Sequence, residues 1–288
     1  MTNWQKQAAG LDADTRTDAL TQGLAQAALA AGELALRYFR PGAPTSADVR
    51  HKDGGSPVTD ADLLVDAFLS ERLRALMPTA GWLSEETADS RARLCERRVL
   101  IVDPIDGTRG YAAGDARWAV SIALVEDGRP ICGVVHAPAL GETFTATAGG
   151  GAFLNGAAIR VSAVERFDAT PRLAATPATA SGLDRAGLPF AAQPRVPSLA
   201  VRLVGVACGR FDAGLVGENA HDWDLAAADL ILNEAGGRLT DLEGCAPVYN
   251  REYTRHGLLT AAPAQLHAQL TEAARRSRQA GGRSRSPG

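Results

Sequence analysis

The chain has 288 residues, of which 45% are hydrophobic and 22% charged, a globular composition that excludes collagen, coiled coil and wholesale disorder. Its 30 basic and 33 acidic residues give a net charge of −3, and this acidic balance argues against a nucleic-acid-binding surface. Because neither a signal peptide nor an apolar run of membrane length is visible, we expect a cytoplasmic protein with no nucleic-acid or membrane partner.

Two helices are predicted at the start of the chain. Apolar residues at helical spacing indicate one helix over residues 17–40 and another over residues 59–77, each followed by a proline that would stop it. Thr59 and Asp62 have the spacing of a capping box at the start of the second helix.

Strand patterns dominate the next part of the chain. A continuous apolar run at residues 99–102 is typical of a buried strand. Alternating residues over 118–124, the Asp127-Gly128 pair and the apolar run at 131–135 predict a hairpin. Shorter strands are expected at residues 82–83, 144–147 and 159–161.

We place a domain boundary near residue 165, which gives an N-terminal α+β subdomain (1–165) and a C-terminal α/β subdomain (166–274). Helices and strands are expected to alternate in the second subdomain, with helices at 198–208, 224–235 and 263–274 and strands at 211–216, 238–241 and 258–261. Residues 275–288 hold five arginines among Gly, Ser and Pro, which predicts a disordered tail.

The segment Asp103-Pro104-Ile105-Asp106-Gly107-Thr108 follows the buried strand directly. Pro104 favours an extended Asp103, and Gly107 permits a sharp turn and the close approach of a ligand to the backbone. Two carboxylates, a carbonyl and a hydroxyl are thus gathered within six residues, an oxygen-only set that suits Mg²⁺. The same residues also suit an ordinary turn, and both interpretations stay open on this segment alone.

Two further acidic segments have ordinary structural interpretations when each is taken alone. Glu85-Glu86 follows the short strand at 82–83 and could form a solvated face. Asp222 and Asp224 lie where a helix is expected to begin, as cap or helix-dipole residues commonly do.

Together these segments resemble the inositol monophosphatase family of lithium-sensitive, Mg²⁺-dependent phosphatases. The resemblance covers about residues 20–270 and keeps the order of four motifs: Lys52 with Ser56-Pro57-Val58-Thr59 and Ala61-Asp62, Leu83-Ser84-Glu85-Glu86, Asp103 to Thr108, and Trp223-Asp224 with Ala226-Ala227. It implies an α/β (α+β) fold, a layered αβαβα sandwich. In that fold an N-terminal antiparallel sheet and a C-terminal mixed, largely parallel sheet flank the active site.

The resemblance also implies a role for each matching residue. Two Mg²⁺ ions, with a third weaker one sharing Glu85, would be held by a set of oxygen ligands: Glu85, Asp103, the Ile105 carbonyl, Asp106 and Asp224. Thr108 would orient the attacking water, with Asp62 or Glu85 as its acidic partner. The backbone N–H groups of Gly107 and Thr108, with Lys52 nearby, would bind the phosphate, and Glu218 would help to shape the leaving-group pocket.

The substrate is less narrowly defined. The runs at 198–203 and 222–230 look like those of bacterial 3'(2'),5'-bisphosphate nucleotidases, which makes adenosine 3',5'-bisphosphate the expected substrate. Inositol 1-phosphate, histidinol phosphate and fructose 1,6-bisphosphate remain alternatives. A catalytically silent relative that binds metal or a nucleotide is an alternative of another class. Family membership also makes lithium inhibition and a homodimer expectations.

Overall fold

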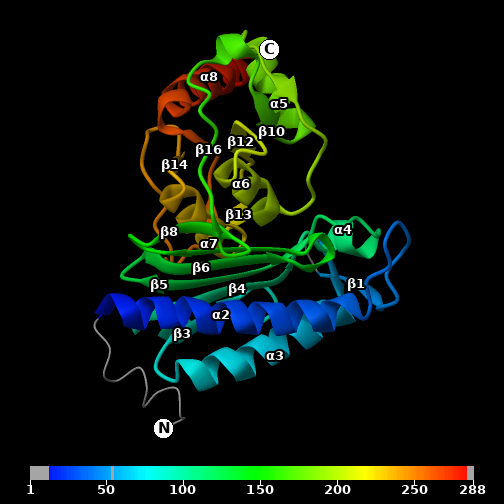
Figure 1. Ribbon diagram of the computed structural model, residues 1–288. Helices are drawn as coiled ribbons and strands as arrows, with labels where there is room; N and C mark the ends of the chain where they lie inside the picture. The colour runs from blue at the N-terminus through cyan, green and yellow to red at the C-terminus, as the bar shows by residue number, and fades with distance from the viewer. Residues whose placement is uncertain (1–12, 53–54, 284–288) are drawn as a thin grey trace.

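The computed structural model describes residues 13–52 and 55–283, and these form five layers in the order helices, sheet, helices, sheet, helices (Figure 1). Helices α2 (Ala13–Leu36) and α3 (Asp60–Leu76) cover the outer face of the first sheet. Helices α6 (Leu199–Ala207) and α7 (Asp222–Glu234) lie between the two sheets, and α5 (Pro177–Arg185) and α8 (Ala264–Arg283) form the last layer. The expected αβαβα sandwich is confirmed.

The first sheet has seven strands that neighbour one another in chain order: β3 (Gly81–Ser84), β4 (Arg98–Asp106), β5 (Ala119–Glu126), β6 (Arg129–Ala137), β7 (Glu142–Thr147), β8 (Gly151–Leu154) and β9 (Ala157–Ala158). All pairings are antiparallel except the parallel pair β3–β4. Asp127 and Gly128 both have positive φ in the β5–β6 turn, so the predicted hairpin is confirmed.

The strand predicted at residues 159–161 is wrong. Backbone pairing continues only to the two-residue β9, after which the Ile159 N–H donates to Ala152 and the Val161 N–H donates to Ala235 at the end of α7. Ile159 and Val161 pack against the core between the sheets. Their apolar spacing therefore reflects packing against other elements rather than membership of a sheet.

The second sheet has five strands in the order β11 (Ala191–Ala192), β10 (Arg172–Ala174), β12 (Ala213–Val216), β16 (Leu259–Pro263) and β14 (Gly237–Thr240). It is mixed, as expected, but β10 makes its two parallel pairings and β16 its two antiparallel ones. The parallel share is thus half rather than the larger part, because the long connection from β14 returns β16 antiparallel between two strands. Two small sheets pair β1 (Val49–His51) with β2 (Pro57–Thr59) and β13 (Ala220–His221) with β15 (Arg255–His256).

Alternation along β5 separates two hydrophobic cores. The larger residues Val120, Ile122 and Leu124 face the core shared with α2 and α3, while Ala119, Ala123 and Val125 face α7. Gly133 in β6 allows α7 to approach closely, since a Cβ there would lie 2.7 Å from the Ala227 carbonyl oxygen. This close contact fixes α7 on the first sheet, and the start of α7 is one side of the candidate site.

The C-terminal tail corrects one prediction. Helix α8 continues to Arg283, so the disorder expected from residue 275 onward is wrong for residues 275–283, and residues 284–288 lie outside the described part. Arg275 donates to the Leu242 carbonyl and Arg278 forms an ion pair with Glu218, which anchor the last turns of the helix. Composition predicted a disordered tail because it contains no information about these contacts.

The boundary expected near residue 165 falls between β9 and β10 and remains a prediction. Helix α7 belongs to the C-terminal part of the chain yet packs against strands of the first sheet. Over the described residues, no helix is both long enough and apolar enough to cross a membrane.

Candidate active site

Two acidic segments meet at the end of strand β4. Asp103 and Asp106 lie in its last four residues and are 1% and 5% exposed. Strand β3 runs parallel to β4 with Ser84 opposite Val102, and the Glu85 N–H donates to the Val102 carbonyl at 3.3 Å. Because parallel strands end at the same edge, Glu85 follows β3 at the edge where Asp103 follows Val102.

The third contribution comes from Asp224 at the start of α7. One carboxylate oxygen each of Asp103, Asp106 and Asp224 lies within 4.8 Å of the other two. The His221 N–H donates to Asp224 Oδ2 at 2.6 Å and holds this carboxylate at the first turn of the helix. Residues separated by more than 100 positions in the chain thus form one acidic cluster: Asp103, Asp106 and Asp224.

The electrostatics of the cluster are unfavourable for three ionised acids. Burial raises the pKa of Asp103 well above its ordinary 3.8, and the charges of Glu85, Asp106 and Asp224 raise it further. Burial and the Asp106 charge likewise raise the pKa of Asp224. Oxygen ligands of this kind fit a hard divalent cation such as Mg²⁺, which would remove the repulsion.

Asp106 is held by the start of helix α6. Its carboxylate accepts hydrogen bonds from the Ser198 hydroxyl at 2.5 Å and from the N–H groups of Ala200 and Leu199 at 2.6 and 3.2 Å. Burial raises the pKa of Asp106 to about 6, although these hydrogen bonds oppose the rise. The cluster is therefore fixed against the middle helical layer.

The turn after Asp106 requires a glycine. Gly107 has φ 92°, and a Cβ there would lie 3.0 Å from the Ser198 nitrogen. The turn leads into the short helix α4 (Thr108–Ala112). Thr108 Oγ1 lies 3.0 Å from both Asp62 Oδ1 and the Ile105 carbonyl oxygen. Its single proton serves one of these acceptors at a time, which leaves its lone pairs able to accept from a water.

Asp62 joins the site from the first turn of α3. Its second carboxylate oxygen accepts from the Thr59 N–H at 2.8 Å and the Thr59 hydroxyl at 2.6 Å, so the predicted capping box is confirmed. Burial raises the pKa of Asp62 above its ordinary value, against the effect of these hydrogen bonds.

Lys52 lies between the paired glutamates. Its ammonium nitrogen is 2.9 Å from Glu85 Oε1 and 2.7 Å from Glu86 Oε1. Burial raises the pKa of Glu86 to about 7, in spite of the hydrogen bond from Lys52. The solvated-face interpretation therefore does not hold for Glu86, whose side chain is 4% exposed.

Two residues that lie near the site motifs in the sequence are not part of the acidic cluster. Glu218 ion-pairs with Arg278 at 3.2 Å and lines a separate hollow between α5 and α8, so the structure does not bring it to the acidic cluster. His221 precedes α7 as its N-cap, and its ring stacks on Trp223 with centroids 4.4 Å apart and planes 7° from parallel.

Sequence reasoning missed Asp66. The Asp66 carboxylate accepts hydrogen bonds from the Ser84 hydroxyl and, at 2.6 Å, from the Thr87 hydroxyl. Ser84 and Thr87 flank the paired glutamates Glu85 and Glu86. One buried acid of α3 thus holds the glutamate segment at both ends. Its spacing of four residues from Asp62 places both acids on the same face of the helix, a signal that the sequence does carry.

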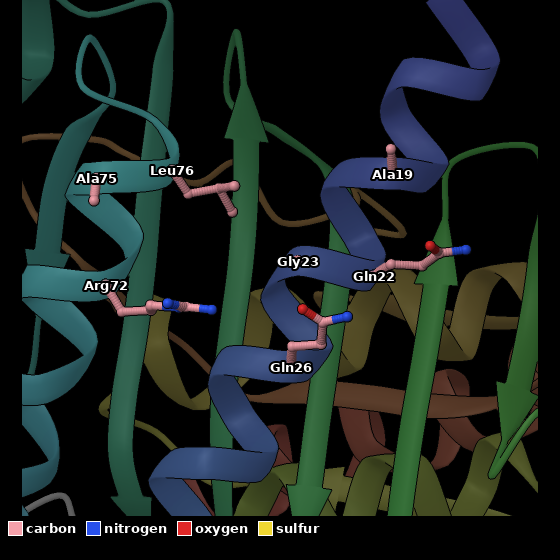
Figure 2. Close-up of a pocket in the computed structure, with 7 residues that line it drawn as sticks. All are labelled: Ala19, Gln22, Gly23, Gln26, Arg72, Ala75 and Leu76. Carbon is pink, nitrogen blue, oxygen red and sulfur yellow. The ribbon is translucent and has the colours of Figure 1, made fainter. Parts of the chain in front are cut away.

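A further hollow of about 320 Å³ lies between α2 and α3, where α3 ends rather than where Asp62 begins it (Figure 2). Its lining mixes apolar and polar residues: Ala19, Gln22, Gly23, Gln26, Arg72, Ala75 and Leu76. None of these side chains carries a carboxylate, thiol or imidazole. The acidic cluster is therefore the better candidate for an active site.

Comparison with known proteins agrees with this arrangement. The model of the Inositol monophosphatase family matches residues 16–279. Inositol monophosphatase 2 of Solanum lycopersicum is 36% identical over 231 residues, which are 76% of this chain and 86% of the relative. Histidinol-phosphatase of Mycobacterium tuberculosis is 39% identical over 211 residues, 66% of this chain and 76% of the relative.

A solved structure shares the fold over most of the chain. Extragenic suppressor protein suhB from Bartonella henselae has a TM-score of 0.78 and 30% identity, and the match covers 90% of this chain and 99% of that one. Together with the family model, which spans nearly all described residues, this likeness shows that the chain belongs to the inositol monophosphatase family.

Proposed function

We propose that this protein is a Mg²⁺-dependent phosphomonoesterase that hydrolyses a small phosphorylated metabolite with an activated water. The observation that carries the proposal is the approach of the Asp103, Asp106 and Asp224 carboxylates to within 4.8 Å in a buried site. Three such acids repel one another and would repel a phosphate ester. A cation between the acids and the substrate would reduce both repulsions.

The metal ligands would be the oxygen set predicted from the sequence. In this assignment Glu85, Asp103 and the Ile105 carbonyl would hold one ion, and Asp103, Asp106 and Asp224 would hold a second. A third, weaker ion would share Glu85. When bound, Mg²⁺ supplies Lewis-acid chemistry that lowers the pKa of a water and stabilises charge on the leaving oxygen.

The remaining residues position the reactants. The Thr108 hydroxyl, between Asp62 and the Ile105 carbonyl, would accept a hydrogen bond from the attacking water, and Asp62 or Glu85 would take its proton. The N–H groups of Gly107 and Thr108 would hold phosphate oxygens, with the Lys52 ammonium near the same group. The hydrogen bonds of Asp106 to α6 keep the turn rigid, so little reorganisation is needed during the reaction.

We propose two groups of candidate substrates, in order of preference. Inositol 1-phosphate and histidinol phosphate come first, because relatives that match most of the chain carry the names inositol monophosphatase and histidinol-phosphatase. Adenosine 3',5'-bisphosphate is the second candidate. It is favoured by the local sequence likeness and by the stacked His221 and Trp223 rings beside Asp224, since aromatic faces of this kind can stack a nucleobase.

Phosphate release tests the proposal. The purified protein is incubated with inositol 1-phosphate, histidinol phosphate, adenosine 3',5'-bisphosphate and fructose 1,6-bisphosphate, each with Mg²⁺ and with EDTA. We expect Mg²⁺-dependent release from one of them, inhibition by lithium, and a loss of at least about 100-fold in Asp103→Asn. The matched control is Asp229→Asn, which removes another buried carboxyl, on α7 and outside the cluster, and should keep its activity.

Two outcomes would contradict the proposal. Mg²⁺ binding without phosphate release from any substrate would favour a catalytically silent regulator. Equal rates in Mg²⁺ and EDTA, or a fully active Asp103→Asn, would show that the acidic cluster does not hold the catalytic metal.

A further inference from the structure

Arg93 is a charged residue with almost no access to water. It lies in the 3-10 helix η1 (Arg91–Cys95), and only 2% of its surface is exposed. Its guanidinium makes a two-pronged pair with the Asp89 carboxylate, Nε to Oδ1 at 2.7 Å and Nη2 to Oδ2 at 2.8 Å. A buried guanidinium is costly unless its donors are satisfied, so the rest of its partners define what the residue does.

Those partners come from the other end of the chain. Nη1 donates to Asn250 Oδ1 at 2.7 Å, Nη2 donates to the Arg251 carbonyl at 3.0 Å, and Asn250 Nδ2 donates back to the Arg93 carbonyl at 3.2 Å. Arg93 therefore ties the segment after β3 to the loop between β14 and β15. None of these three contacts can be anticipated from residues near Arg93 in the sequence.

The connection continues to the start of helix α7. The Asn250 N–H donates to Asp222 Oδ2 at 2.8 Å, and the other oxygen of Asp222 lies 2.7 Å from His256 Nε2. The Asp222 N–H in turn donates to the Thr254 carbonyl at 2.9 Å. Asp222 is 1% exposed and lies two residues before Asp224, so its position and that of Asp224 are set together.

The ends of this chain of contacts lie beside the two halves of the acidic site. Asp89 is four residues after Glu85, and Asp222 is two residues before Asp224. We infer that Asp89, Arg93, Asn250 and Asp222, named here the Arg93 bridge, fix the spacing between the Glu85 segment and the Asp224 helix so that both can serve one set of metal ions. Arg93 is thus a positioning residue for divalent metal. The inference rests on the proposed function.

Geometry and chemistry both favour this role over simple support of the fold. Asp66 and the β3–β4 pairing hold the Glu85 segment to the N-terminal part, while Asp224 reaches the site from a helix of the C-terminal part. In addition to the packing of α7 on the first sheet, the Arg93 bridge crosses between these parts through hydrogen bonds of the almost fully buried Arg93 guanidinium and the buried Asp222 carboxylate. Substitution of residues that orient metal ligands without touching the ion commonly lowers metal affinity by about 10- to 100-fold.

Two variants test the bridge without removing any proposed ligand. Asn250→Gly deletes the amide that meets Arg93 but keeps the backbone N–H to Asp222, and glycine adopts the φ of 57° at this position without strain. Arg93→Lys keeps the charge but loses the planar fork. The matched control is Arg172→Lys, because Arg172 makes the same two-pronged contact with Asp212 in the second sheet, at 3.0 and 2.8 Å.

Mg²⁺ affinity is measured on metal-free protein by isothermal titration calorimetry, together with the thermal midpoint in EDTA. We expect the Mg²⁺ Kd to rise about 10-fold in Asn250→Gly and Arg93→Lys, and to stay at the wild-type value in Arg172→Lys even where its midpoint falls. The Mg²⁺ concentration for half-maximal phosphate release should rise by the same factor, while the rate at saturating Mg²⁺ approaches that of the wild type.

Unchanged Mg²⁺ affinity in Asn250→Gly would overturn the inference, whatever happens to stability, since the bridge would then serve the fold alone. Should Arg93→Lys fail to fold, Asn250→Gly decides the question. Failure of the proposed function gives a different result, namely no Mg²⁺-dependent phosphate release by the wild-type protein.

Discussion

Replacing Asp103 by asparagine should stabilise the metal-free protein while it destroys metal binding. The asparagine has the shape of the aspartate, and its Oδ1 can still accept the hydrogen bond that the Ile105 N–H donates at 3.0 Å. The substitution therefore removes one negative charge from the acidic cluster and little else. Sites that gather like charges for a ligand cost stability when that ligand is absent.

The size of the gain follows from the distances in the cluster. Two unit charges 4.8 Å apart repel by about 3–4 kcal/mol at an effective dielectric constant of about 20, and Asp103 faces both Asp106 and Asp224 within that distance. The wild-type protein relieves part of this repulsion by binding protons, because the pKa values of the cluster are raised. For Asp106, burial is the largest cause of the rise from 3.8 to about 6, which corresponds to about 3 kcal/mol at pH 8 and gives the scale of the cost of a charge buried at this site. We therefore expect Asp103→Asn to gain about 2–4 kcal/mol, or roughly 3–7 °C in Tm for a chain of this length.

The sign of the pH dependence is also set. A carboxyl whose pKa is higher in the folded than in the unfolded protein contributes stability in full at pH values below its unfolded pKa. This contribution is lost as the pH rises through its folded pKa. The Tm of the metal-free wild type should accordingly fall as the pH rises from about 4 to 7, the range set by the raised pKa values of Asp106 (about 6) and Glu86 (about 7). The Tm difference between Asp103→Asn and the wild type should grow as the pH rises.

Thermal unfolding in EDTA from pH 4 to pH 8, repeated with Mg²⁺, tests this reasoning. With Mg²⁺ the wild type should gain Tm and Asp103→Asn should not, while the control Asp229→Asn should keep the wild-type gain. A folded Asp103→Asn whose Tm in EDTA at pH 8 equals or lies below that of the wild type would refute the assigned repulsion.

Three further substitutions test individual contacts. Gly107→Ala forces a side chain to φ 92° against the Ser198 nitrogen, so unfolding in urea should show a loss of about 1–3 kcal/mol; a loss under about 0.5 kcal/mol would mean that the turn relaxes freely. Asp66→Ala leaves two hydroxyls beside the paired glutamates without their acceptor and should weaken Mg²⁺ binding about 10-fold in calorimetry, an effect that unchanged affinity would disprove. Tyr249→Phe removes the hydrogen bond of 2.8 Å to the buried Asp229 and should lower the free energy of unfolding by about 1–3 kcal/mol; the idea fails if the variant is as stable as the wild type.

Features that depend on near neighbours could be predicted from the sequence. The buried strand that ends in Asp103 to Thr108, the Asp127-Gly128 hairpin and the Thr59 capping box all involve residues a few positions apart. Their hydrophobic pattern and turn chemistry determine them locally. The order of the acidic motifs also indicated the family and the layered fold.

Other features depend on partners far along the chain. Arg93 resembles a surface arginine in the sequence, yet Asn250 and Asp89 bury its charge. The arginine-rich end of α8 resembles a solvated tail, yet the helix continues to Arg283, and Arg275 and Arg278 meet the Leu242 carbonyl and Glu218. The sequence by itself thus determined which acidic residues are available to the candidate site and on which kinds of element they lie. Only the tertiary structure decided which of them meet, because burial and the distance between charges are properties of residues brought together from both halves of the chain.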